Sequence, residues 1–333
     1  MADNSKVSKT AAAVTGTKQL GSEAKLQKYG VFFVIPFIVI YLFFQLWPTI
    51  YTVLLAFTDL KGFATKLHFV GLKNFARLIH DKFFWGAIGN TFIMWTFNFI
   101  PQLGIALLFA IWFTDPRMHL KCKNAFRALF YMPNLLTAAS VAILFRSLFG
   151  YPNGPINQFL YNLGIQHVYT NDAGEVIREG INFFRSIPWS RGIVSFIQWW
   201  LWCGQTLIML MAGITSISPS LYESAVVDGA NQSQQTWYIT LPLLKPMMLY
   251  ILITGLIGGM QLFEIPFLLT DMYGGPQNKI RTMVVYMYNQ AFQGVNDYAY
   301  GSAIAMGVFI ITMVLSMFIY FFMQDRSDYG RKN

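Results

Sequence analysis

Six apolar stretches, each long enough to cross a lipid bilayer as a helix, constrain this chain more than any other feature of its sequence. Crossing about 30 Å of hydrocarbon takes roughly 20 helical residues at a rise of about 1.5 Å each. The stretches cover residues 31–57, 86–114, 126–149, 192–213, 247–270 and 299–323. Because backbone polar groups in lipid must be paired within the protein, we predict an all-α membrane protein with six transmembrane helices.

The composition agrees with this prediction and excludes other classes of protein. Hydrophobic residues make up 55% of the 333 residues and charged residues 12%, about half the charged share of a soluble domain. An ordinary soluble enzyme, a disordered chain and a nucleic-acid-binding module are therefore excluded. In a membrane protein, a net charge of +9 is most simply loop charge that fixes orientation.

Charge also predicts the orientation and the division of the chain. With six spans both termini lie on one side, and that side carries 13 Lys and Arg against 10 on the other, in shorter segments. Positive charge in short flanks marks the cytoplasmic side, so we expect both termini in the cytoplasm. We divide the chain into an N-terminal tail (1–28), a transmembrane domain (29–323) and a C-terminal tail (324–333).

Motifs for catalysis and for metal binding are absent from the sequence. It contains neither the P-loop pattern GxxxxGK[ST] nor HExxH, and its two cysteines are far apart, so we predict no catalytic or metal site. The predicted spans contain a single carboxylate, Glu264, whereas ion-driven carriers depend on carboxylates within the membrane. This disfavours an ion-coupled secondary transporter, and no group of residues argues for a membrane enzyme or scaffold.

One long polar segment, residues 216–246, interrupts the apolar pattern and has a helical pattern of its own. Ser218 followed by Pro219 is typical of a helix start, and Gly229 can end that helix by adopting positive φ. Ser220 and Glu223 offer a second, capping-box register for the start. A short apolar face is formed by Leu221, Tyr222, Ala225 and Val226. A cytoplasmic helix with such a face requires a partner.

The segment ESAVVDGA (223–230), followed by ITLP, resembles the EAA motif of binding-protein-dependent ABC importer permeases. Further resemblances occur in the expected order along residues 30–323: Phe84-Trp85 with Asn90-Thr91, Arg127 with Pro133, Ile217–Tyr222, Thr270–Pro276 and Tyr300–Ala305. Ser224 stands where the family usually has alanine, and Pro219 lies one position later than the family's proline. The set is similar to the carbohydrate-importing, maltose-type (MalF-like) branch.

The resemblance implies a type I ABC importer permease core in a bacterial cell membrane. It implies as partners a second permease subunit, two ATP-binding subunits that bind ATP and Mg, an extracellular solute-binding protein and a sugar or oligosaccharide. This chain would itself hold no cofactor and bind no nucleic acid. The coupling helix that docks on the ATPase would include Glu223, Ser224, Ala225, Asp228 and Gly229. The simpler alternatives are a capping carboxylate for Glu223 and a plain helix stop for Gly229.

Polar side chains within the spans are candidates for a substrate pathway, because polar groups that face lipid are costly. By resemblance to the maltose-type members, we expect the pathway to be lined by Asn134, Gln198, Trp202, Gln205, Thr254, Gly258, Gln261 and Glu264. Amides and an aromatic face match the hydroxyls and flat apolar surfaces of neutral sugars. The alternative is that these amides form hydrogen bonds between helices. The glycines of GLIGGM (255–260) would allow close helix packing.

Overall fold

The computed structural model describes residues 32–62, 67–115, 123–165, 167–170, 176–270, 272–294 and 296–323, with the backbone alone in the two strands. Both predicted tails lie outside these residues. The chain divides into two units, Met1–Leu55 and Ala56–Asn333. In the first unit one helix spans Phe32–Leu55, including a π-helical turn, η1 (Leu42–Leu46), and α2 (Trp47–Leu55). The hydroxyl of Thr49 donates to the carbonyl of Gln45 within this helix.

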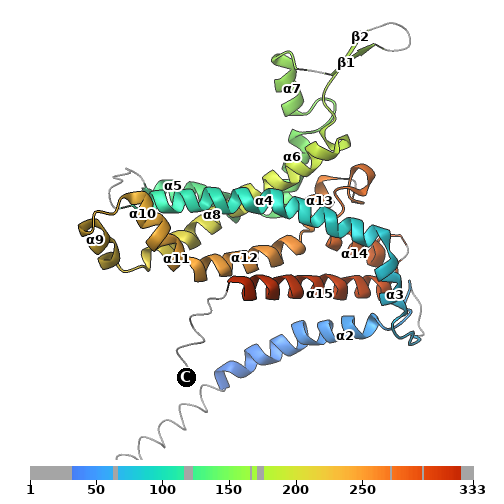
Figure 1. The fold of residues 1–333 in the computed structure, drawn as a ribbon. Helices are drawn as coiled ribbons and strands as arrows, with labels where there is room; N and C mark the ends of the chain where they lie inside the picture. The colour runs from blue at the N-terminus through green and yellow to red at the C-terminus, as the bar shows by residue number, and fades with distance from the viewer. Residues whose placement is uncertain are drawn as a thin grey trace, which may run out of the picture. The chain divides into compact units, whose positions relative to one another are not determined.

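Long apolar helices run side by side through the second unit (Figure 1). They are α4 (Lys82–Thr114), α8 (Ile187–Thr215), α12 (Lys245–Met260), continued by α13 (Glu264–Leu269), and α15 (Tyr298–Met323). Among the described residues five helices, counting Phe32–Leu55, are long and apolar enough to cross a membrane, and six if one bent pair counts as a span. The prediction of six spans therefore holds when the bent pair is included.

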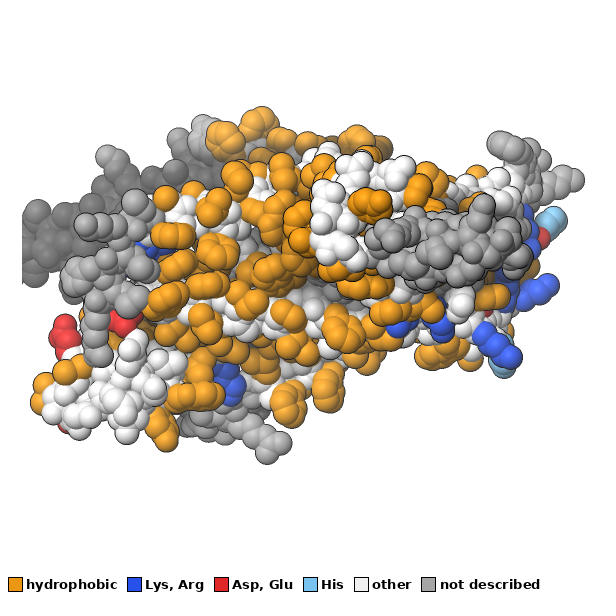
Figure 2. Space-filling model, turned by 90° about the horizontal axis from the view of Figure 1, so that it is seen from above, with side chains coloured by type: hydrophobic (Ala, Val, Ile, Leu, Met, Phe, Trp, Pro, Cys, Tyr) orange, Lys and Arg blue, Asp and Glu red, His pale blue; other side chains and the backbone are white. Residues whose placement is uncertain are grey.

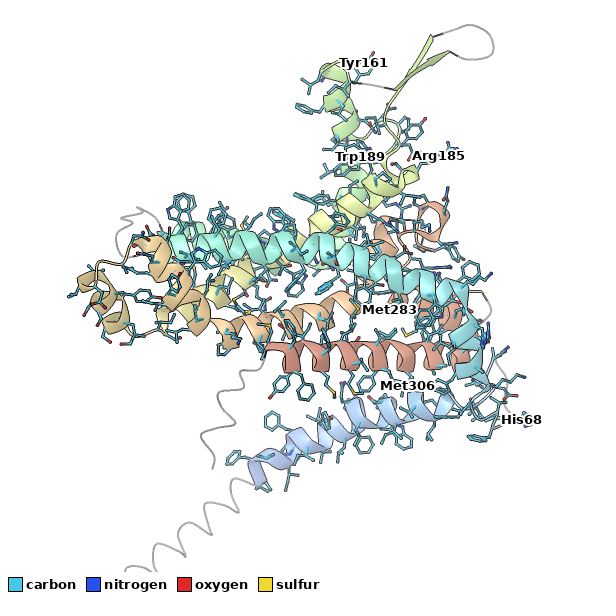
Figure 3. The ribbon with its side chains drawn as sticks, in the orientation of Figure 1. His68, Tyr161, Arg185, Trp189, Met283 and Met306 are labelled. Atoms are coloured by element: carbon cyan, nitrogen blue, oxygen red, sulfur yellow. The ribbon has the colours of Figure 1, made fainter. Side chains whose placement is uncertain are left out.

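Shorter elements occupy the two ends of this helical body (Figure 1). At one end lie α9 (Pro219–Val227), α10 (Gln232–Gln235), η4 (Thr236–Thr240) and α11 (Leu241–Leu243). At the other lie α3 (Lys73–His80), η5 (Pro276–Asn278) and α14 (Met283–Phe292). Beyond α6 (Ala138–Leu148), three elements stand away from the body: α7 (Pro155–Asn162), which carries Tyr161, and the antiparallel strands β1 (His167–Thr170) and β2 (Val176–Glu179) (Figures 1 and 3). The turn η3 (Phe183–Arg185) leads into α8.

The third predicted span differs from the sequence prediction. Residues 126–149 were expected to form one helix, but α5 (Lys123–Tyr131) and the 3₁₀ turn η2 (Met132–Leu135) meet α6 at an angle of 89°. Pro133 lacks an amide hydrogen for the helical ladder. The Thr137 side chain then accepts a hydrogen bond from the amide of Ser140 and caps a new helix. A proline followed closely by a capping residue therefore turns the chain.

Glycines allow the long helices to approach each other closely. A Cβ on Gly204 would lie 2.0 Å from the carbonyl oxygen of Phe130, where α8 crosses α5. On α12, a Cβ would lie 2.3 Å from the ring of Phe99 at Gly255 and 2.0 Å from Trp95 at Gly259. The indole of Trp95 also donates to the carbonyl of Gly255, at 3.0 Å. Two of the three GLIGGM glycines, Gly255 and Gly259, therefore allow α12 to pack closely against α4.

Side-chain bonds hold the end of the body that contains α3 and α14. Asp297 is buried and pairs with Lys61 at 3.2 Å and with Arg77 at 2.9 Å. Asp81 accepts hydrogen bonds from the hydroxyls of Tyr286 and Tyr300. Burial alone would raise the pKa of Asp81, but these bonds and backbone amides outweigh it, so that the pKa lies below its ordinary value. The helices α3, α4, α14 and α15 are joined here.

The surface and the interior follow the polarity expected of a membrane protein. Apolar side chains cover the middle of the face shown in Figure 2, while Lys, Arg, Asp and Glu are visible toward its two ends. Inside, Met283 packs with Tyr286, Tyr300 and Leu256 in one of the apolar clusters between the helices (Figure 3). The apolar surface is the part suited to lipid.

Candidate functional site

A cavity of about 440 Å³ lies between α4, α8 and the point where α12 gives way to α13. Its wall combines amide, hydroxyl and aromatic side chains with small residues. It is lined by Asn98, Phe99, Gln102, Ala138, Gln198, Trp202, Gln205, Thr206, Met209, Ile251, Thr254, Gly255, Gly258, Gly259, Gln261, Leu262, Phe263, Glu264 and Ile265. Seven of the eight predicted pathway residues are therefore brought together here.

Helical geometry and a break in the fifth span place these side chains. Gln198, Trp202 and Gln205 share one face of α8 because they recur at helical spacing. Helix α12 ends at Met260, and Gln261 follows it as C-cap. The predicted continuous span 247–270 is thus broken between Met260 and Glu264, which exposes Gln261 and Glu264 to the cavity. A Cβ on Gly258 would meet nothing within 4 Å, so this glycine leaves open space.

Asn134, the eighth predicted residue, is not among the lining residues. Its side-chain amide lies behind the wall and donates to the carbonyl of Leu201 at 3.3 Å and to Oε1 of Gln205 at 3.4 Å. It therefore supports the position of Gln205. This contact is of the interhelical kind that the alternative interpretation described.

Two amides of α4 belong to the cavity wall although the sequence analysis did not select them. Asn98 and Gln102 lie one turn apart and are 8% and 7% exposed. The Gln102 amide donates to the Thr206 hydroxyl at 2.7 Å, and that hydroxyl contacts the carbonyl of Trp202 at 3.2 Å. A signal existed in the sequence, because NFIPQ places two amides one turn apart within an otherwise apolar stretch.

The polar segment 216–246 forms a loop that contains the short helical elements α9, α10, η4 and α11, and α9 starts and stops where the sequence predicts. Helix α9 begins at Pro219 after Ser218, whose side chain makes no capping bond. Gly229 has φ of +79°, its amide donates to Val226, and the amide of Ala230 donates to the carbonyl of Ala225. This pair of bonds is a Schellman motif. A second helix, α10, is closed by a capping box between Asn231 and Gln234 that the sequence analysis did not identify.

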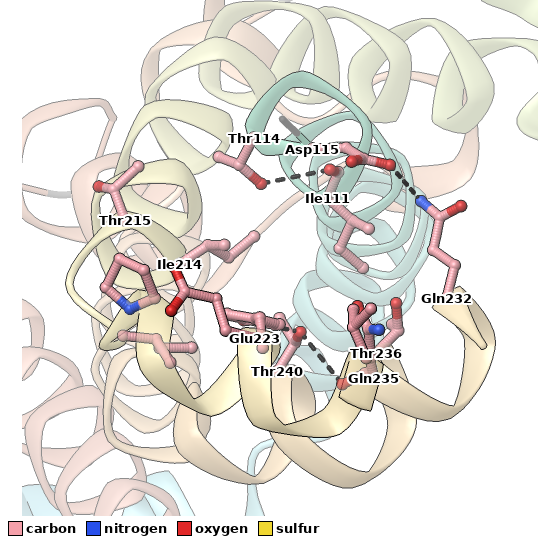
Figure 4. A pocket seen from close by; sticks show the side chains of 14 residues that line it. Ile111, Thr114, Asp115, Ile214, Thr215, Glu223, Gln232, Gln235, Thr236 and Thr240 are labelled. Carbon is pink, nitrogen blue, oxygen red and sulfur yellow. Dashed lines mark hydrogen bonds between the residues drawn. The ribbon is translucent and has the colours of Figure 1, made fainter. Parts of the chain in front are cut away.

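Behind α9 lies a second, larger and mostly apolar cavity of about 660 Å³ (Figure 4). Glu223 and Tyr222 of α9 line it, opposite Asp115 at the end of α4. Gln232 donates to Asp115 at 2.5 Å, and the hydroxyls of Tyr222 and Thr240 lie 3.0 Å apart. Glu223 is exposed and makes no capping bond with any described residue, so the structure does not support the capping alternative.

The remaining residues predicted for coupling also lie on this loop. Ser224 and Asp228 are exposed, and the Ser224 hydroxyl donates to the carbonyl of Ser220 within α9. Ala225 is half-buried and accepts the Schellman bond. Over the part of the chain that is described, no three His, Cys, Asp or Glu side chains come together as a metal site.

Comparison with known proteins identifies the family. No protein-family model matches the chain. The lactose transport system permease protein LacF of Rhizobium radiobacter is 28% identical over 309 residues, which are 92% of this chain and 98% of LacF. The sulfoquinovosyl glycerol transport system permease protein SmoG of Agrobacterium fabrum is 30% identical over 253 residues, 74% of each chain. This chain belongs to the family of sugar ABC importer permeases.

Solved structures agree with this membership at the level of fold. A chain of the bacterial alginate ABC transporter, solved in complex with a periplasmic protein bound to alginate pentasaccharide, superimposes with a TM-score of 0.72. It is 23% identical, and the match covers 90% of this chain and 94% of that chain. The solved structure confirms the predicted permease fold, and the sequence relatives confirm the predicted family. The permease is a membrane protein and a transport component of a binding-protein-dependent system, rather than an enzyme.

Proposed function

We propose that this permease carries a neutral sugar or short oligosaccharide through the cavity between α4, α8 and α12. The observation that carries the proposal is the composition of the wall, in which amides, hydroxyls and Trp202 surround about 440 Å³. Amides supply directional donors and acceptors for sugar hydroxyls, and an indole ring offers an apolar face to a pyranose. The relative LacF, which is named for lactose transport, supports a carbohydrate cargo.

In the proposed assembly, the loop 216–246 faces the cytoplasm and docks on an ATP-binding subunit. Both termini lie on that same side of a bacterial cell membrane. Glu223, Ser224, Ala225, Asp228 and Gly229 form the docking surface, supported by their resemblance to the EAA motif and by the exposure of α9. A second permease subunit and two ATP-binding subunits complete the membrane complex, and a solute-binding protein delivers the sugar. Closure of the ATPase pair then drives alternating access.

Reconstitution in liposomes tests this proposal against an ion-coupled carrier. The chain alone should move no sugar and hydrolyse no ATP, because the energy source lies on its partners. With its partner permease, ATP-binding subunits and solute-binding protein, it should accumulate a sugar such as lactose or an arabino-oligosaccharide only when ATP is inside. Uptake by the chain alone, driven by a proton or sodium gradient, would refute the proposal.

A further inference from the structure

The cavity of about 440 Å³ between α4, α8 and α12, the central cavity, has charge of only one sign on its described wall. Among the described residues that line it, Glu264 alone is charged, and no Lys, Arg or His contributes. Interactions between charges are stronger in a cavity within a protein than in bulk water, because the protein around the cavity screens them less. The sign of this single charge therefore matters to whatever enters.

Glu264 has no partner among the described residues that would explain its position. It is the first residue of α13, is exposed to the cavity, and makes no hydrogen bond or ion pair with any other described residue. A carboxylate at membrane depth is costly, and one that only stabilises the fold is normally paired. The break that ends α12 at Met260 is what turns this side chain toward the open space.

The complementary ligand for this wall is one that donates hydrogen bonds. Glu264 can accept them through its carboxylate, and the amide oxygens of Gln198 and Gln261 are further acceptors among the lining residues. Oδ1 of Asn98 does not take part, because that atom is buried away from the open space.

We propose that Glu264 determines which class of saccharide this permease accepts, by binding the hydroxyls of uncharged sugars and rejecting acidic ones. Hydroxyl groups donate to a carboxylate in short, charge-assisted bonds. A uronic acid brings a second negative charge and further acceptors, and it meets no cation on this wall. The inference rests on the proposed function, since it assumes that the cavity is the path of the sugar.

The fold by itself does not set this preference. A second solved neighbour, with a TM-score of 0.73 and 23% identity, is a transporter involved in the import of the acidic polysaccharide alginate. A shared fold is therefore compatible with acidic cargo in that transporter.

The test uses the complete membrane complex without its solute-binding protein, so that selectivity reports on the permease. Maltose, lactose and cellobiose are compared with counterparts in which the terminal hydroxymethyl group is oxidised to a carboxylate. Dissociation constants follow from the rise of the melting temperature with sugar concentration. For the wild type we expect the acidic member of the best-bound pair to bind about tenfold more weakly, or worse, than the neutral one.

Glu264→Gln should bring the two dissociation constants to within about twofold, because it keeps size and polarity and removes the charge. Glu264→Asp should keep the discrimination. Asp59→Asn changes the net charge by the same amount as Glu264→Gln, but on an exposed loop outside the cavity. It should leave the ratio of the two dissociation constants unchanged. If Glu264→Gln does not assemble, Gln261→Glu tests the same idea by adding a carboxylate to the wall, and the ratio should then increase.

Two results would overturn the inference alone: equal binding of neutral and acidic sugars by the wild type, or an unchanged ratio in Glu264→Gln. In both cases ATP-driven uptake of a sugar by the complete system would leave the proposed function intact. If no sugar stabilises the complex and the complete system takes up none, the proposed function fails and the inference fails with it.

Discussion

The cavity between α4, α8 and α12 (the central cavity) and the cavity behind α9 (the loop cavity) are built in opposite ways. The central cavity gathers side chains from α4, α8, α12 and α13, which are distant in sequence and held by close helix contacts. The loop cavity takes most of its wall from one continuous segment, closed by a Schellman motif and a capping box. One region depends on tertiary packing, whereas the other depends on local backbone chemistry.

This difference has consequences for substitutions. In the packed region, the effect of a change depends on which neighbour a side chain meets, so adjacent positions can differ sharply. In the loop, side chains such as Glu223 are exposed, so a substitution should leave the fold intact and change only what docks there. Four experiments test this contrast.

Glu223→Lys should have the largest effect, which is loss of uptake to background. It places a positive charge where the proposed docking surface presents a carboxylate, while α9 keeps its start and its Schellman stop. Sugar uptake and sugar-stimulated ATP hydrolysis in liposomes measure the loss, and Glu223→Gln should be intermediate. Thermal stability of the isolated permease should not change. Normal uptake by Glu223→Lys would show that the loop does not dock through this residue.

Gly259→Ala and Gly258→Ala form a matched pair in the packed region. The new Cβ at 259 would lie 2.0 Å from Trp95, whereas at 258 it would meet nothing within 4 Å. We expect Gly259→Ala to destabilise the permease by about 3 kcal/mol, as overpacking does, and Gly258→Ala to leave stability unchanged. Unfolding in detergent measures both. Equal stability of the two variants would contradict the close packing of α12 against α4 at Gly259.

Gln261→Leu and Gln102→Leu separate binding from interhelical bonding. The Gln261 side chain bonds to no other described residue, so Gln261→Leu should reduce uptake or change sugar preference while assembly and basal ATP hydrolysis stay normal. Gln102 donates to Thr206, so Gln102→Leu should cost about 1 kcal/mol of stability. Uptake and thermal stability are measured on both. Destabilisation by Gln261→Leu with sugar preference unchanged would make Gln261 a structural residue.

Tyr222→Phe should have the smallest effect. It removes the hydroxyl that lies 3.0 Å from that of Thr240 and so loosens α9 from η4, at a cost of about 1 kcal/mol. Hydrogen exchange of the α9 amides should become faster, with exchange in α8 and α12 unchanged. Unchanged exchange in α9 would mean that the Schellman motif alone holds this helix.

The sequence predicts the loop, which depends on neighbouring residues, better than the bundle, which depends on tertiary packing. The helix start at Pro219 and the stop at Gly229 depend on residues next to each other, and both were predicted. The 89° turn after Pro133 was not, because prolines are tolerated inside membrane helices and only the packing of α6 decides. Asn98 and Gln102 were overlooked since helical spacing within α4 does not reveal what α8 places opposite them. Seven of the eight predicted pathway residues do share the cavity, whereas Asn134 lies behind it.

The space behind α9 has a mechanical consequence. Helix α9 faces a cavity of about 660 Å³, and the hydroxyls of Tyr222 and Thr240 join it to η4. A compressive force on its outer surface therefore reaches the bundle mainly through the ends of the helix. In the proposed assembly such a force travels along the chain, through Ser216–Ser218 into α8 on one side and through α10, η4 and α11 into α12 on the other. The loop then transmits the force to two helices of the central cavity, α8 and α12, at the same time.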